Sequence, residues 1–244
     1  MIEFERLAET GGRLVEQLRE GGLERLDETL TASRTTAGTY RYTYDRYLQY
    51  FREKRGQPLT EQDLYIGFAF AYSWMASIKQ LDPALATVKA ATAALNELHA
   101  MQPASLDMDS EAAADISDEQ VENLAAATEP LRYFLGSVIG TSKLLHFVNP
   151  EVFPIWDAII HRYSRLPKTS AADSLRLYAQ YTCMVHRLTH HADFETRIYE
   201  PLLRAMEAAH RQVGKRYRAP EPMGKVRATE FIMFFGGKAE HAPA

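Results

Sequence analysis

The chain of 244 residues has little of several features that mark particular protein classes. A single cysteine, Cys183, excludes a disulfide-stapled scaffold, and we expect it to be a buried, inert thiol. With 13 glycines, 11 prolines and 46% hydrophobic residues, the chain is neither collagen-like nor wholly disordered. No run of about 18 apolar residues is present, so no membrane span is expected. A chain of this length is expected to bury a large core without a metal or a disulfide.

The sequence also lacks a recognisable targeting segment. Met1–Arg6 contains no basic region followed by an apolar run, which a secretory signal would need. We therefore expect a cytoplasmic protein with no membrane partner, and a small bacterial type of protein.

Strand-like alternation of apolar and polar residues is nearly absent. Apolar residues recur instead at spacings of three and four, which predicts an all-α, multi-helix globular fold. One domain and two packed helical subdomains are both compatible with this pattern. Composition suggests four consecutive regions, in which the third holds the candidate site: a helical region 1–100, an acidic loop or linker 101–117, a helical region 118–213, and a basic segment 214–244 containing Pro and Gly.

Local signals refine this helical prediction. Thr60 is predicted to cap a helix that continues through Trp74 to Ile78, and short separate helices are predicted at 120–127 and 129–138. Any long helix near the C-terminus is expected to be broken by Pro220, Pro222, Gly224, Gly236 and Gly237. The apolar run 231–235 is expected to dock on the body.

Aromatic residues are concentrated in one predicted helix near 38–55. They follow the spacing i, i+4, i+7, i+11, which favours core packing over a base-stacking surface. The residues with this spacing are Tyr40, Tyr44, Tyr47 and Phe51.

Charge is distributed unevenly along the chain. Residues 1–130 carry 12 Lys and Arg against 22 Asp and Glu, whereas 131–244 carry 16 against 10. The densest basic stretch, 211–227, includes Arg216 and Arg218 around Tyr217, a combination suited to phosphate contact and base stacking. A solvated charged tail explains the same stretch, and both interpretations stay open.

Two clusters have some resemblance to metal sites, but no metal or other cofactor is expected. The acidic residues of 107–115 lack the glycine and the terminal Glu spacing of a calcium loop. His186 and His190 lie one helical turn apart, with His191 beside them, but no zincin Glu accompanies them. Polar capping at a helix end is the favoured interpretation of the histidines.

The segment 135–163 contains the most informative pattern. Gly136 and Gly140 would permit a tight turn between two helices, and the amides at the second helix N-terminus could bind an anion. Lys143 follows at that helix start. Asp157 is predicted to open the next helix, and His161, one turn further on, could hydrogen-bond to it.

This pattern resembles the signature of the helix-hairpin-helix DNA glycosylases, over about 30 residues. Ile139-Gly140-Thr141-Ser142-Lys143 is similar to the family's hairpin and lysine, and Pro154-Ile155-Trp156-Asp157 to its aspartate element. The hairpin lacks the family's usual proline and tight Gly-x-Gly spacing, and the separation between Lys143 and Asp157 is shorter than usual.

The resemblance implies a base-excision enzyme of glycosylase or abasic-site lyase character that acts on DNA. Lys143 would attack the sugar and form a Schiff base, and Asp157 would stabilise positive charge on it. Trp156 would stack on a base. The other implied or predicted substrate contacts are Gly140, Thr141, His161, Arg216 and Arg218. The alternative is a non-catalytic helical module that binds a protein or nucleic acid, with Lys143 exposed, Asp157 a helix cap and Trp156 a core anchor.

Overall fold

The fold is described from a computed structural model, over residues 3–30, 34–75, 84–106, 116–166, 174–213 and 223–239. These residues form ten α-helices, a short 3-10 helix Pro103–Leu106 and a π-helical turn Glu195–Tyr199, and they contain no strand. The predicted all-α fold is therefore confirmed. Among these residues, none of the helices combines the length and apolar character needed to cross a membrane.

The chain divides into two compact units, each assembled from separate stretches of sequence. Unit 1 comprises residues 1–45, 157–166 and 188–244, and unit 2 comprises 46–156 and 167–187. The predicted division into four consecutive regions remains a prediction. Two segments on which it depends, 107–115 and 214–222, lie outside the described residues.

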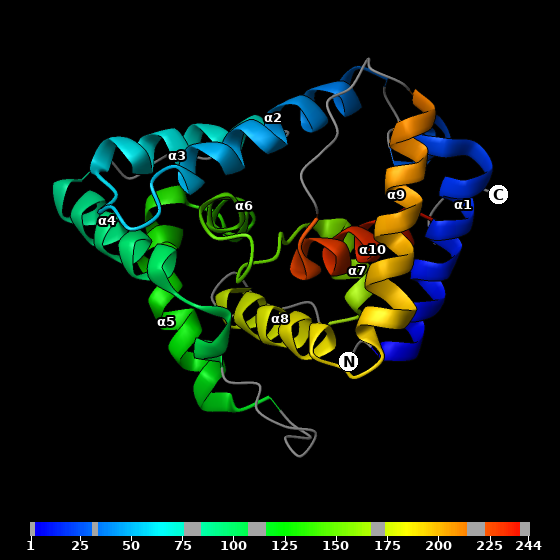
Figure 1. The fold of residues 1–244 in the computed structure, drawn as a ribbon. Helices are drawn as coiled ribbons and strands as arrows, with labels where there is room; N and C mark the ends of the chain where they lie inside the picture. Colours follow the sequence, from blue (N-terminus) through cyan, green and yellow to red (C-terminus); the bar gives the residue numbers. More distant parts are fainter. Residues whose placement is uncertain are drawn as a thin grey trace. The chain divides into compact units, whose positions relative to one another are not determined.

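Unit 1 is built around its first helix. This helix, α1, packs against α9 and α10, and α10 packs on α7 (Figure 1). The four helices are α1 (Phe4–Leu30), α7 (Ala158–Ser164), α9 (Glu200–Val213) and α10 (Lys225–Ala239). α1 continues through Gly11 and Gly12 but kinks at Gly22, where φ is 60° and ψ is −157°, a conformation open to glycine because it lacks a Cβ.

The expected break at Gly236 and Gly237 is wrong, because α10 runs through both residues. Glycine is used here for close packing. A Cβ at Gly237 would lie 2.6 Å from the Ile159 carbonyl oxygen, and one at Gly236 would lie 2.5 Å from the Tyr163 ring, so α10 approaches α7 only because these side chains are absent. The expected docking of 231–235 is confirmed by the buried Ile232, Met233 and Phe235.

Unit 2 places four helices in mutual contact, with α3 on α6 and α4 on α5 (Figure 1). They are α3 (Glu61–Ser73), α4 (Leu85–Ala100), α5 (Asp118–Leu135) and α6 (Val138–Val148). The end of α2 (Arg34–Arg52) and most of α8 (Ser174–Thr189) also belong to this unit. The expectation of two short helices at 120–138 is wrong, because α5 is continuous across Pro130 and α6 begins at Val138. The predicted continuation of α3 through Trp74 is also wrong, because the helix ends at Ser73 and Trp74 is its C-cap.

The aromatic face of α2 is only partly a core face. Phe51 is fully buried, as expected from its spacing, whereas Tyr44 and Tyr47 are half-buried. The side chain of Tyr40 lies outside the described part of the structure. Tyr47 stacks on Phe70 of α3 with ring centroids 3.8 Å apart, so its ring serves helix packing.

Candidate functional site

The turn between α5 and α6 forms where the sequence predicts it. Gly136 ends α5 in the left-handed conformation, with φ of 65°, and its N–H donates to the Arg132 carbonyl at 2.8 Å. Ser137 is extended and caps α6, because its Oγ accepts from the Gly140 N–H at 3.2 Å. A two-residue connection thus joins the two helices.

The last turn of α5, next to this connection, carries a half-buried cation and an exposed aromatic ring. The Arg132 guanidinium carbon lies 5.3 Å from the centroid of the Tyr133 ring, and Tyr133 is 57% exposed. The amides of Val138 and Ile139, in the first turn of α6, have no acceptor in the part of the chain that the structure describes. This end of unit 2 therefore contains several hydrogen-bond donors that have no acceptor among the described residues.

Gly140 and Thr141, two predicted substrate contacts, are buried. The Gly140 amide is held by Ser137, and Thr141 Oγ1 donates to the Ser137 carbonyl at 2.8 Å. Both residues therefore stabilise the turn from inside.

Lys143 has a buried position on α6. Its side chain is only 8% exposed, and its Nζ donates to the main-chain carbonyl of Trp74, the C-cap residue of α3. A cation is favoured at a helix C-terminus, where carbonyl groups point outward. The amine thus stabilises the end of α3, and the solvent-facing lysine of the non-catalytic alternative is wrong.

Asp157, in unit 1, is the N-cap of α7. Its Oδ1 accepts from the amides of Ile159 and Ile160, each at 2.8 Å, and the side chain is half-buried. The suggested bond to His161 is not formed, because Asp157 bonds those amides while His161 Nε2 lies 3.1 Å from the Leu166 carbonyl. The predicted helix start at Asp157 is confirmed.

Trp156 is buried rather than available for stacking on a base. It is 6% exposed, and its ring lies 4.6 Å from that of Tyr181. Trp156 ends a buried, irregular segment, 152–156, whose hydrogen-bond partners the sequence did not predict.

Each of the five successive carbonyls in 152–156 faces a side chain from α6 or α8. The contacts are His186 Nε2 to Val152 O at 2.7 Å, His146 Nδ1 to Phe153 O at 2.8 Å, and Tyr178, Tyr181 and Ser142 hydroxyls to Pro154, Ile155 and Trp156 O at 3.2 Å. Because a carbonyl only accepts, each of the two histidine nitrogens carries a proton. We call these five side chains the carbonyl clamp.

His186 of the suggested metal cluster is buried, and its Nε2 lies 2.7 Å from the Val152 carbonyl oxygen. His190 and His191 lie at the end of α8, where His191 stacks on Phe4 with centroids 3.7 Å apart. Within the described residues, no group of three or more His, Cys, Asp or Glu side chains is arranged to hold a metal. Burial raises the pKa of the Cys183 thiol to about 11, in keeping with an inert thiol.

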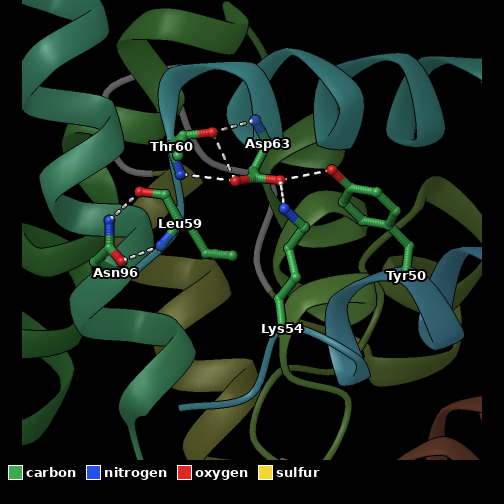
Figure 2. A network of polar contacts seen from close by, with 6 residues as sticks. All are labelled: Tyr50, Lys54, Leu59, Thr60, Asp63 and Asn96. Carbon is green, nitrogen blue, oxygen red and sulfur yellow. Dashed lines mark hydrogen bonds and ion pairs between the residues drawn. The ribbon is translucent and has the colours of Figure 1, made fainter. Parts of the chain in front are cut away.

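A second polar cluster surrounds Asp63, whose side chain is 1% exposed (Figure 2). Its carboxylate accepts from Tyr50 at 2.5 Å, from Lys54 at 2.6 Å, and from the Thr60 N–H at 2.8 Å. Thr60 Oγ1 accepts in return from the Asp63 amide, which completes the predicted capping box of α3. Beside it, Asn96 of α4 bonds both backbone groups of Leu59.

The hydrogen bonds of this cluster outweigh the effect of burial on the Asp63 carboxylate. Burial alone would raise the pKa of Asp63, but hydrogen bonds from Lys54, Tyr50 and Thr60 hold it well below its usual value. Burial and the bond to Asp63 raise the pKa of Tyr50. We assign this cluster to the stability of unit 2, because its polar atoms pair with one another.

The predicted contacts Arg216 and Arg218 lie outside the described residues. Lys143, Trp156 and the α5–α6 turn belong to unit 2, whereas Asp157 and His161 belong to unit 1. No protein-family model matches this chain, and no curated protein or solved structure was found to be similar to it.

Proposed function

We propose that the protein binds the sugar–phosphate backbone of DNA through the turn between α5 and α6. The observation that carries this proposal is the grouping of Arg132, Tyr133 and the unoccupied amides of Val138 and Ile139 at one end of unit 2. Guanidinium and backbone amide groups donate to phosphate oxygens, and an exposed ring stacks on bases. The chain's resemblance to the helix-hairpin-helix glycosylases supports the same partner.

The charges near the turn make the proposal testable. Among the described residues, Arg132 has no carboxylate partner, and the exposed Glu129 lies one turn before it on α5. Binding to phosphates releases counterions, so the affinity falls as salt rises. Arg132→Glu is therefore expected to weaken duplex binding, and Glu129→Lys to strengthen it.

The experiment measures the anisotropy of a labelled DNA duplex over a salt series. Glu97→Lys provides the matched control, because Glu97 is exposed on α4 and this substitution changes the net charge by the same amount. An equal gain in affinity from Glu97→Lys and Glu129→Lys would show that net charge governs binding, and it would refute a role for the turn.

The finer proposal is that the protein excises a base, with Asp157 as the charged group. The observation that favours it is that Asp157 Oδ1 is held by two amides while Oδ2 has no partner in the described chain. In this reaction the bond between C1′ and the base breaks and the base leaves with the electron pair. The carboxylate stabilises the sugar cation, water adds to C1′, and a proton passes to solvent.

This form of the proposal gives Lys143 no covalent role. A Schiff base needs a neutral amine that can reach the sugar, whereas the Lys143 amine is buried and donates to the Trp74 carbonyl. We therefore expect base release from damaged duplexes without a borohydride-trapped complex. A trapped band that Lys143→Gln abolishes would restore the lyase mechanism.

Two substitutions isolate the charge of Asp157 from its capping role. Asn and Ser both cap helices well, so Asp157→Asn and Asp157→Ser are expected to fold and to lose excision. The non-catalytic module is favoured by the backbone partners of both Lys143 and Asp157. Salt-sensitive DNA binding without base release from any substrate would establish that module.

A further inference from the structure

Aromatic side chains continue from the last turn of α5 onto α3, within unit 2. Tyr65 of α3 is 41% exposed, and its ring centroid lies 5.6 Å from that of Phe134, with the ring planes at 75°. Phe134 is fully buried and directly follows the exposed Tyr133 in the chain. Half-buried Phe68, one turn after Tyr65, lies 6.4 Å from the same Phe134 ring. We call Tyr65, Phe68 and Tyr133 the aromatic patch.

Contacts of Tyr72 fix the patch beside the α5–α6 turn. The Tyr72 hydroxyl donates to the Leu135 carbonyl at 2.6 Å, where α5 ends. Its ring lies 4.6 Å from that of Phe68, and a Cβ at Gly140 of α6 would lie 3.5 Å from it. α3 is thus bonded to the end of α5 and packed on the start of α6. The patch therefore adjoins the donors that we assign to the DNA backbone.

Two rings of the patch, Tyr65 and Tyr133, are open to solvent. Single exposed apolar residues are common on proteins, but these two neighbour the same buried ring, Phe134, one by contact and one along the chain. A tyrosine side chain is flat and loses little freedom when a partner covers it, so it stacks well on a nucleic-acid base. A duplex covers the faces of its bases with neighbouring pairs, whereas unpaired bases present their faces to a protein.

The charges around the patch favour the same kind of partner. Arg132 supplies a cation over the Tyr133 ring. The exposed Glu61 and Glu129 lie one turn before Tyr65 and Arg132, and their carboxylates repel phosphate. A duplex has a higher density of phosphate charge than a single strand, so this repulsion weakens duplex binding more. Stacking on bases adds affinity that does not depend on net charge.

We propose that the aromatic patch binds unpaired bases, so that single-stranded DNA is the preferred partner of this end of unit 2. The proposal rests on the proposed function, because Arg132 and the α6 amides hold the backbone of the same strand. Tyr65 and Tyr133 stack on bases of that strand, and Phe68 supports them from the side of α3.

The test compares a labelled single strand of about 12 nucleotides with the duplex of the same sequence, by anisotropy at equal salt. We expect the wild type to bind the single strand about tenfold more tightly than the duplex. Tyr65→Leu and Tyr133→Leu should each weaken single-strand binding about tenfold and change duplex binding less than about twofold. Tyr65→Phe and Tyr133→Phe are the matched controls, because they keep the ring and should bind like the wild type.

A stacking signal and a folding check accompany these affinities. A fluorescent base analogue in the strand should lose emission when a ring stacks on it, and this loss should be smaller with Tyr133→Leu. Circular dichroism checks folding, which Tyr133→Leu should retain because this side chain is 57% exposed. Unchanged single-strand affinity in folded Tyr133→Leu would overturn the proposal.

The outcomes distinguish this proposal from the proposed function. Equal affinity for the two DNA forms, salt-sensitive and weakened by Arg132→Glu, would support the backbone contact and overturn the contact to bases. Equal losses for both forms in the Leu variants would also overturn it, because a duplex presents no free base faces along its length. Absence of binding to either form would contradict the proposed function itself.

Discussion

Replacing Asp63 by Ala is expected to cause a large loss of stability, because its carboxylate is buried and bonded by several groups. The carboxylate accepts from Tyr50, Lys54 and both donors of Thr60, and it completes the capping box of α3 (Figure 2). Removing it leaves the Thr60 N–H and the Tyr50 hydroxyl without their acceptor.

The magnitude follows from these contacts. Loss of a helix cap costs about 1 kcal/mol, and a hydrogen bond to a charged group contributes about 1.5–3 kcal/mol when its partner is buried. The side chain of Lys54 is 32% exposed, so water replaces much of what it loses. We therefore expect Asp63→Ala to lower the free energy of unfolding by about 3 kcal/mol.

Urea unfolding followed by circular dichroism measures this change. The control is Asp118→Ala, because Asp118 is 91% exposed and its ion pair with Arg176 should contribute below about 1 kcal/mol. A loss below about 1 kcal/mol for Asp63→Ala would refute the assignment of this network to stability.

The acid dependence gives a second measure of the same network. Because the folded pKa of Asp63 is lowered, its contribution is present above the unfolded pKa of about 3.9 and is lost as pH falls toward the folded pKa. Asp63→Ala should therefore unfold with a weaker dependence on pH below about 4 than the wild type.

Local signals predicted helices well where their physical cause is local. The Thr60 cap and the left-handed Gly136 each depend on residues within one turn, so the sequence contains the whole cause. The helix predictions that were wrong concern positions whose conformation depends on residues far away in the sequence. Gly236 and Gly237 continue α10 because α7 packs closely against them. Helix propensity is a property of single residues and does not include such a contact.

In the candidate site, too, local features were predictable from the sequence and contacts between distant residues were not. The helix start at Asp157 was predictable from its capping chemistry, but the burial of Lys143 depends on Trp74, which is 69 residues away. The carbonyl clamp has no local signature either. Its donors reach back to 152–156 from as far as His186, 34 residues further along the chain, and single Tyr, His and Ser residues on helices have many other uses.

The remaining predictions test packing and titration. Lys143→Met should lower the free energy of unfolding by about 1–3 kcal/mol, whereas Lys89→Met, on the exposed face of α4, should change it by less than about 0.5 kcal/mol in the same urea assay. Gly67→Ala should cost about 1–3 kcal/mol because its Cβ meets a leucine of α6, while Gly12→Ala, with nothing within 4 Å, should stabilise α1; equal effects would contradict the close approach. Burial lowers the pKa of His99, although the Phe51 carbonyl and Asp63 oppose this and Arg55 adds to it. The unfolded state then binds the proton more tightly, so stability should fall as pH drops below about 6.5. His99→Gln should flatten this slope between about pH 7 and 5, and an unchanged slope would show that another group causes it.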